Sequence, residues 1–239
     1  MSFFSENLPK VQARIEAALR RSNRPPGSVT LIAVTKTHTP DVVREALAAG
    51  LDQIGENKVQ EARAKKPEAG DRGVWHLIGH LQHNKVKYVP PLFDWVHSID
   101  SLGLARDLSD RAREDGRRLK ILLQINPAGE STKFGVPPDQ ASALAEQLNK
   151  LPNLELRGVM MLAPYYLEVE RTRPLFAQLR ETRDRVEKET GLALPELSMG
   201  MSHDFEVAIE EGATIIRLGT VLFGPRVRAA KATHDEGAE

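Results

Sequence analysis

Residues 29–50, VTLIAVTKTHTPDVVREALAAG, decide the fold. Residues 29–35 are almost all apolar or β-branched, which is typical of a strand that is buried on both faces. Pro40 and Asp41 then begin a helix that ends at Gly50, since proline favours the first turn of a helix and glycine its end. A buried strand followed by a helix is the repeating unit of parallel α/β proteins, and the stretch therefore predicts that class.

The same alternation continues along the chain. Further strands are predicted at residues 52–55, 75–79, 95–99, 119–125, 154–161, 196–199 and 214–218, and helices at residues 57–66, 101–116, 138–150, 168–190 and 202–211. Eight strands predict an α/β fold, a single (β/α)8 TIM barrel, with a doubly wound open sheet as the alternative. We expect one domain over residues 1–239, with an extra N-terminal helix at 1–24 and a flexible tail at 228–239.

The composition argues against several classes of protein. The 239 residues include 33 Lys and Arg, 33 Asp and Glu, and no Cys. Balanced charge disfavours a whole-surface grip on nucleic acid or an anionic membrane, and the lack of Cys removes disulfides, thiol nucleophiles and Cys-ligated metals. The start, MSFFSENLPK, lacks a signal-peptide pattern, and no apolar run approaches the roughly 18 residues of a membrane span. We therefore expect a cytoplasmic protein.

Lys36 is the first candidate for chemistry, because barrel active sites lie at the carboxyl ends of the strands. It ends the predicted strand 29–36, and strand alternation places it on the same face as Ile32 and Val34. Its side chain either extends to water or presents an amine at the mouth of the barrel, where an amine can attack a carbonyl group.

Small and hydroxyl residues follow the last two predicted strands. Ser202 is a candidate N-cap of the helix 202–211, while Gly219 and Thr220 come directly after strand 214–218. Glycine lets backbone N–H groups approach an anion, and hydroxyl groups donate hydrogen bonds to it. Each residue alone is an ordinary turn residue, but their coincidence after strands seven and eight favours a phosphate site.

Two more polar residues lie near the same end of the predicted barrel. Arg217 shares a face with Ile215 in an apolar strand, and a buried charge needs a partner. That partner is an acidic side chain on a neighbouring strand or a polar ligand at the mouth. Asn57 follows strand 52–55, either as a pocket residue or as the N-cap of the next helix.

His76, His80 and His83 have a spacing that resembles a metal site. If residues 75–79 form a strand, four residues separate His76 from His80 by ~13 Å, which is too far to share one ion. We therefore predict no metal site here and expect His80 to line the mouth.

Several stretches together resemble one family, the pyridoxal 5′-phosphate (PLP) homeostasis proteins. They occur in the family's order and span residues 31–226. The matching stretches are LIAVTKTHTPDVVREALAAG, IGENKVQEA, WHLIGHLQHNKVK, VHSIDS, GESTKFGV, RGVMML and LSMGMSHDFEVAIEEGATIIRLGTVLFGPR. The resemblance implies a barrel like the N-terminal domain of alanine racemase, with PLP bound at its mouth.

The resemblance also implies a role for each candidate residue. The implied contacts are the internal aldimine on Lys36, the phosphate at Ser202, Gly219 and Thr220, the pyridine nitrogen at Arg217, and the ring near Asn57. PLP is an aldehyde that carries a phosphate, so it matches both the amine and the anion site predicted from the residues.

These features favour a protein that holds PLP and buffers or delivers it without turnover. A charged arginine facing the pyridine nitrogen disfavours a proton there, which makes the ring a poorer electron sink. The chain also has no length for the second domain of a racemase. The alternatives are a PLP-dependent racemase or lyase with Tyr165 or Tyr166 as its second base, and a Schiff-base aldolase for a phosphorylated sugar.

The remaining expectations concern partners and a second lysine. We expect a monomer that binds PLP and meets PLP-dependent apo-enzymes transiently, with no nucleic acid or membrane as a partner. Lys133, in GESTKFG, is either a second amine near the opening or a solvated loop residue. Residues 163–167 and His203 depart from the family pattern, and Tyr165 and Tyr166 could alter what reaches the mouth.

Overall fold

Eight parallel strands close into a barrel in the computed structural model of this chain, which describes residues 2–70, 72–127, 129 and 134–225. Each strand pairs with the next, and β8 pairs with β1 from Thr30 opposite Ile215 to Ala33 opposite Leu218. This closure confirms the (β/α)8 barrel and excludes the doubly wound sheet, in which the edge strands stay unpaired. The strands are β1 Thr30–Val34, β2 Gln53–Glu56, β3 Val74–Leu77, β4 Trp95–Ile99, β5 Leu119–Gln124, β6 Leu154–Met160, β7 Glu196–Met201 and β8 Ile215–Leu218.

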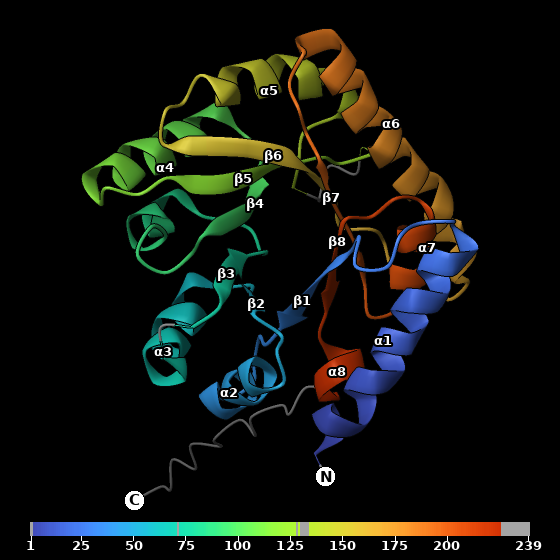
Figure 1. The fold of residues 1–239 in the computed structure, drawn as a ribbon. Coiled ribbons are helices and arrows are strands. Elements are labelled where there is room, and N and C mark those ends of the chain that lie inside the picture. Colours follow the sequence, from blue (N-terminus) through green and yellow to red (C-terminus); the bar gives the residue numbers. More distant parts are fainter. Residues whose placement is uncertain (1, 71, 128, 130–133, 226–239) are drawn as a thin grey trace, which may run out of the picture.

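Helices surround the barrel (Figure 1). The α-helices are α1 Phe3–Arg21, α2 Pro40–Ala48, α3 Val59–Ala69, α4 Leu102–Glu114, α5 Ala141–Asn149, α6 Arg173–Thr190, α7 Phe205–Glu210 and α8 Thr220–Phe223. Short 3-10 helices are η1 His83–Tyr88, between β3 and β4, η2 Pro138–Gln140 and η3 Val169–Thr172. The predicted tail, residues 228–239, and Lys133 lie outside the described residues.

The predicted N-terminal helix is present as α1, which packs against α7 and α8 (Figure 1). Its buried residues are Phe4, Leu8, Val11, Ala18 and Leu19. On its polar side, Arg14 pairs with Glu206 at 2.8 Å and Arg21 pairs with Glu210 at 2.7 Å. Partly exposed ion pairs contribute at most about 1 kcal/mol each, so the apolar face provides most of the stabilisation of this contact.

Several element boundaries differ from the sequence prediction. Strand β1 ends at Val34, so Lys36 lies in the turn that follows the strand rather than at its last position. Helices α5 and α6 begin later than predicted, because 3-10 turns over η2 and η3 precede them. Proline explains part of both shifts: Pro138 lies in η2 and Pro174 in the first turn of α6, and proline suits the start of a helix.

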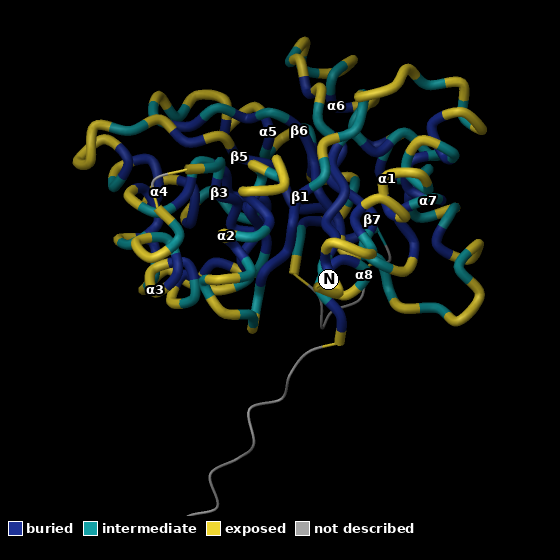
Figure 2. The backbone as a smooth tube through the Cα atoms, turned by 60° about the horizontal axis from the view of Figure 1, so that its bottom comes forward, coloured by how far each residue is buried: buried dark blue, intermediate teal, exposed yellow. Residues whose placement is uncertain are grey.

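Apolar side chains form two layers of core. The inner layer fills the barrel with Ile32, Val34, Ile78, Trp95, Leu122, Met160 and Ile215. A larger outer layer, which includes Ala33, lies between the strands and the helices. The alternation of β1 therefore points Ile32 and Val34 inward and Ala33 outward. Figure 2 shows buried residues along the strands and exposed residues on loops and outer turns.

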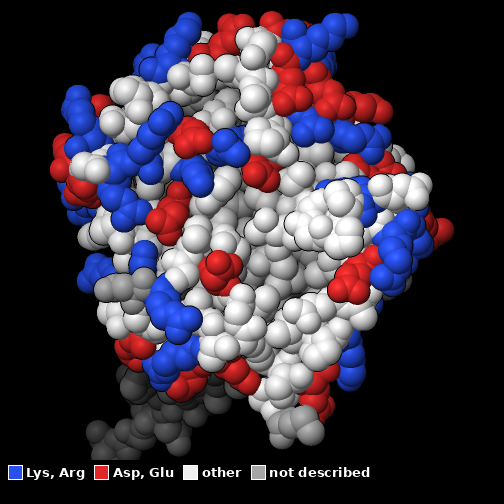
Figure 3. All heavy atoms as spheres, viewed as in Figure 1, with Lys and Arg blue, Asp and Glu red and all other residues white. Residues whose placement is uncertain are grey.

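Charged side chains of both signs are interspersed on the face drawn in Figure 3, and neither sign dominates it. This distribution agrees with the equal numbers of acidic and basic residues in the chain. The central part of that face is mostly uncharged. No helix of the described residues is long and apolar enough to cross a bilayer.

Candidate functional site

The six candidate residues come from one arc of the barrel rim. Lys36 follows β1, Asn57 follows β2 and Ser202 follows β7. Arg217 lies in β8, Gly219 follows it, and Thr220 begins α8. Strands β7, β8, β1 and β2 are consecutive neighbours in the closed sheet, and the carboxyl ends of parallel strands lie at the same rim. The fold therefore brings together residues that are up to 184 positions apart, from Lys36 to Thr220.

Contacts within this arc confirm how closely β8 and β1 approach. Gly219 lies beside the end of β1, since a Cβ atom built on Gly219 would be 3.2 Å from the carbonyl oxygen of Val34. The hydroxyl oxygen of Ser202 accepts hydrogen bonds from the N–H groups of Gly219 at 3.2 Å and Val221 at 3.4 Å. The two backbone N–H groups and the Ser202 hydroxyl therefore meet near the end of β1, and Lys36 lies two residues further along the chain. Thr220, the first residue of α8, is exposed.

The prediction that Ser202 caps helix α7 is wrong. Helix α7 begins at Phe205, and Asp204 occupies the N-cap position. The Asp204 carboxylate accepts the Met201 N–H at 2.6 Å, which closes the turn before the helix. Because its hydroxyl contacts the β8 turn instead, Ser202 links the two loops that were predicted to form the phosphate site.

The turn that carries Lys36 is held by a buried cluster on α3 and β2. On one side of Lys36, the Thr35 hydroxyl donates to Glu56 Oε1 at 2.6 Å. Lys65 Nζ donates both to Glu56 Oε1 at 2.8 Å and to the carbonyl oxygen of Thr35 at 2.7 Å. On the other side, the Thr37 N–H donates to Glu61 Oε2 at 2.7 Å. The backbone on both sides of Lys36 is therefore anchored to the next β/α unit.

The anchored turn has an unusual backbone conformation at Thr37, and the buried cluster beside it contains a carboxyl group with a raised pKa. Thr37 has φ of 66°, a left-handed conformation that costs a non-glycine residue free energy and needs support from its surroundings. Burial raises the pKa of Glu56 to about 7, although the Lys65 ammonium group opposes this. Sequence reasoning missed the cluster, and its only local signal was a glutamate at the end of a buried strand.

Arg217 is buried, with 3% of its surface exposed, and points into the barrel like Ile215. It donates to the Ser198 hydroxyl and to the carbonyl oxygen of Met161 at 2.8 Å. Burial lowers the pKa of Arg217 to about 10, while the nearby Asp204 carboxylate opposes this shift. Among the described residues, no acidic side chain hydrogen-bonds to Arg217, so the first of its two predicted partners is absent; the groups it contacts are a hydroxyl and a carbonyl.

Asn57 does not cap the helix after β2, because α3 begins at Val59 and Lys58 occupies its N-cap position. Instead, the Asn57 backbone lies against Gly79 after β3, where an added Cβ atom would be 2.3 Å from the Asn57 carbonyl oxygen. Only glycine permits this approach. The two residues line a cavity of about 580 Å³ that also includes His80.

These residues fit the chemistry expected for PLP. An amine, a pair of backbone N–H groups beside a hydroxyl, and a guanidinium group come from adjoining strands at one rim. Comparisons with known proteins identify the family of this chain. The sequence profile described as "Alanine racemase, N-terminal domain" matches residues 7–227.

Two relatives cover almost the whole chain. A pyridoxal phosphate homeostasis protein of Aquifex aeolicus is 45% identical over 222 residues, which is 92% of this chain and 97% of that protein. Another, of Pseudomonas aeruginosa, is 44% identical over 234 residues, which is 98% of this chain and 100% of that protein. This chain belongs to the pyridoxal phosphate homeostasis protein family.

Solved structures agree with this membership. PipY of Synechococcus elongatus, solved with PLP bound, has a TM-score of 0.78 and 44% identity, covering 89% of this chain and 100% of PipY. Alanine racemase of Clostridium difficile has a TM-score of 0.70 at 15% identity, covering 90% of this chain and 56% of the racemase. The racemase comparison shows the fold alone, and it places the barrel of this homeostasis family in just over half of a longer enzyme.

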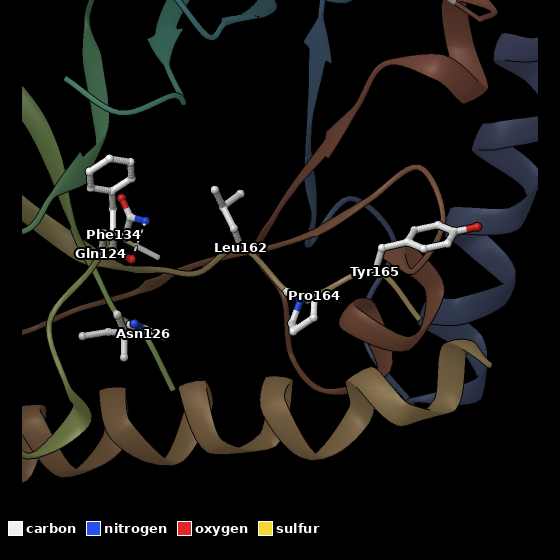
Figure 4. Close-up of a pocket in the computed structure, with 8 residues that line it drawn as sticks. Gln124, Asn126, Phe134, Leu162, Pro164 and Tyr165 are labelled. Carbon is white, nitrogen blue, oxygen red and sulfur yellow. Dashed lines mark hydrogen bonds between the residues drawn. The ribbon is translucent and has the colours of Figure 1, made fainter. Parts of the chain in front are cut away.

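A second cavity, of about 370 Å³, lies beyond the ends of β5 and β6 in this family member (Figure 4). Gln124, Asn126 and Phe134 line one part of it, and Gln124 donates to the Phe134 carbonyl oxygen at 3.0 Å. Leu162 lies between them and Tyr165, whose ring points away from the other labelled side chains. Sequence reasoning predicted a role for Tyr165 but missed the polar pair, although Gln124 ends a largely apolar strand and Asn126 follows it.

The three histidines with metal-like spacing have different partners. His76 lies inside the barrel with its Nδ1 atom 3.0 Å from His97 Nε2. The ring of His80 stacks on Phe134 with 3.6 Å between centroids, and His83 contacts Asp107 at 2.6 Å. The spacing in the sequence therefore does not bring them to one point, and His80 lies near the mouth as predicted.

Proposed function

We propose that this protein binds PLP covalently at Lys36 and buffers or delivers it, without turnover of its own. The observation that carries the proposal is the placement of the Lys36 turn next to the Ser202–Gly219 contact at one rim, in a chain whose relatives are named for PLP homeostasis. PLP supplies an aldehyde that condenses with a primary amine, forming a carbon–nitrogen double bond and releasing water; the reverse reaction releases it.

Each part of the chain has a distinct role in this proposal. The Glu56–Lys65 pair holds the backbone at Thr35 and Glu61 holds it at Thr37, so the amine of Lys36 enters the mouth from a fixed direction. The Ser202 hydroxyl, whose oxygen accepts from the Gly219 and Val221 N–H groups, keeps its own hydrogen to donate to a phosphate. Arg217 provides a cation at the inner side of the mouth, where it disfavours protonation of a ring nitrogen.

The absence of turnover rests on two arguments. A ring without a proton on its nitrogen is a poorer electron sink, so removal of an α-proton from a bound amino acid is disfavoured. The second base that a racemase needs would have to be Tyr165 or Tyr166. Tyr165 is 72% exposed, and its ring points away from the other labelled side chains of the cavity beyond β5 and β6 (Figure 4).

Reduction with borohydride followed by mass analysis tests the proposal. Protein purified after incubation with PLP is expected to carry one pyridoxyl phosphate on Lys36, and Lys36→Ala is expected to lose both the adduct and the near-visible absorbance. Lys150→Ala is the matched control, because Lys150 is exposed at the end of α5, away from the strand ends that form the mouth.

Three results would contradict parts of this proposal. Unchanged absorbance in Lys36→Ala removes the covalent site, and a sugar adduct on Lys36 favours the aldolase instead. Exchange of the α-proton of amino acids into deuterated water, lost in Tyr165→Phe, would establish the racemase or lyase alternative.

A further inference from the structure

A line of buried polar side chains crosses the inside of the barrel, where apolar residues would be expected. Ser198 and His97 have 0% of their surface exposed, His76 has 1% and Arg217 has 3%. They come from β7, β4, β3 and β8, and they share the barrel interior with residues such as Trp95, whose ring stacks on His76. Burying polar groups is unfavourable unless each one has a hydrogen-bond partner, so each of these side chains needs a donor or an acceptor inside the barrel.

The partners form one continuous chain. Arg217 donates to the hydroxyl oxygen of Ser198, which is 3.0 Å from His97 Nδ1. His97 Nε2 is 3.0 Å from His76 Nδ1, and His76 Nε2 is 2.9 Å from Oε1 of Gln53. Gln53 is the first residue of β2, so the chain runs from the mouth of the barrel to its amino-terminal end. We call these residues, Gln53, His76, His97, Ser198 and Arg217, the interior line.

The Gln53 end determines the direction of the hydrogen bonds. The Nε2 group of Gln53 donates to Asp52 Oδ1 at 3.0 Å, which turns its carbonyl oxygen toward His76. A carbonyl oxygen only accepts, so His76 must carry a hydrogen on Nε2. Burial lowers the pKa of His76 to about 3, so its ring is neutral and its Nδ1 atom is an acceptor.

The same reasoning passes along the rest of the line. His97 must donate from Nε2 to His76, and burial lowers its pKa well below the usual value, so its Nδ1 atom is an acceptor too. The hydrogen of the Ser198 hydroxyl then points to His97 Nδ1, and the oxygen keeps its lone pairs for Arg217. The reverse direction would place the Ser198 hydrogen without an acceptor along the line and would set two acceptors against each other at Gln53.

We propose that His76, His97 and Ser198 are positioning residues, a hydrogen-bond line of fixed direction that holds the Arg217 guanidinium at the inner side of the PLP site. This inference rests on the proposed function for the identity of the ligand. A hydroxyl that donates to an imidazole becomes a stronger acceptor, and each link polarises the next. The line therefore stabilises a cation inside the barrel with neutral groups and fixes where that cation lies.

Nuclear magnetic resonance of histidine nitrogens tests the direction of the line in the wild-type protein without PLP. We expect His76 and His97 to be neutral, each with its hydrogen on Nε2, at every pH between about 5 and 8. A hydrogen on Nδ1 of either ring, or an imidazolium in that range, overturns the proposal. This measurement does not depend on PLP binding, so it stands even if the proposed function fails.

Variants test whether the line positions Arg217. Ser198→Ala removes the link next to the guanidinium, and His97→Phe keeps a ring while removing both nitrogens. Met160→Leu is the matched control, because Met160 is buried in the same barrel interior but is not part of the line. In the protein without PLP, we expect the Arg217 side-chain hydrogens to exchange with solvent about tenfold faster in Ser198→Ala than in Met160→Leu.

The PLP-loaded protein gives a second readout. In Ser198→Ala and His97→Phe, we expect the pH profile of the PLP absorbance to shift relative to wild type and Met160→Leu, with Lys36 still modified by borohydride. If exchange and absorbance profiles both match those of Met160→Leu, the line is only a polar core and the proposal is wrong. If Lys36 is not modified even in wild type, the proposed function fails. The histidine tautomers and the Arg217 exchange rates then still show whether the interior line has a fixed direction and holds Arg217.

Discussion

Replacing Glu56 with glutamine should change the pH dependence of stability. The free energy of unfolding of the variant, relative to that of the wild type, should be higher near neutral pH than at acidic pH. Glu56 has 0% of its surface exposed, and burial raises its pKa from 4.5 to about 7 despite the neighbouring Lys65. Its second carboxylate oxygen, Oε2, is buried and has no hydrogen-bond partner. Glutamine has nearly the same shape, and its amide oxygen can accept from Thr35 and Lys65 without a buried negative charge.

The sign follows from the protons bound in each state. Between pH 4.5 and about 7, the folded protein keeps the Glu56 proton while the unfolded chain has lost it. The free energy of unfolding therefore falls as pH rises through this range. A difference of about 2.5 pKa units corresponds to about 3 kcal/mol, as each unit is worth about 1.4 kcal/mol. Glu56→Gln should remove this loss. The difference in free energy of unfolding between the variant and the wild type should therefore grow by up to about 3 kcal/mol as pH rises through this range.

Urea unfolding at pH steps between 4.5 and 8 measures the effect. Glu61→Gln is the matched control. Burial raises the pKa of Glu61, but the hydrogen bond from the Thr37 N–H and the charge of Lys65 lower it by more, so its pKa is lowered overall. Glu61 therefore contributes stability above pH 4.5 that is lost as pH falls, and its replacement should change the acidic side instead. Parallel curves for wild type and Glu56→Gln across pH 4.5–7 would refute the reasoning.

Further predictions concern backbone approach and the anion site. Gly158→Ala should destabilise the protein by several kcal/mol or prevent folding, because the new Cβ would be 2.0 Å from the Glu196 carbonyl oxygen. In the control Gly103→Ala, the atom nearest to the new Cβ is 3.9 Å away, so the melting temperature should stay unchanged or rise slightly. Equal melting temperatures would count against the packing argument. Ser202→Ala should weaken binding of PLP about tenfold, and binding of pyridoxal, which lacks the phosphate, by much less. Equal losses in titrations of both ligands would show that Ser202 does not serve the phosphate.

Periodicity along the chain was enough to predict the barrel. Helices separate most of the eight strand segments, and the burial of β1 on both faces is visible as the apolar run of Ile32, Ala33 and Val34. Element boundaries were less accurate, because the ends of elements depend on local competition for hydrogen bonds. Asp204 accepts the Met201 N–H, so the helix predicted at 202 begins at Phe205.

Candidate site residues could be chosen from the sequence where they carry a local signal of their own. Lys36 after an apolar strand, and glycine and serine after the last strands, are local patterns that barrel topology brings to one rim. The Glu56–Lys65 pair was not predictable, because nothing in the sequence says that Lys65 reaches both Glu56 and the carbonyl of Thr35, which is 30 residues away along the chain.

The amino-acid sequence by itself therefore determined the strands and helices, the amine and the glycine and hydroxyl turns, since these depend on side chains a few residues apart. Only the tertiary structure decided what each polar group contacts. His97 and Ser198 are 101 residues apart, yet their side chains meet inside the barrel. Closure of the sheet removes water from its interior, so every buried donor there must find an acceptor on another strand, wherever that strand lies in the chain.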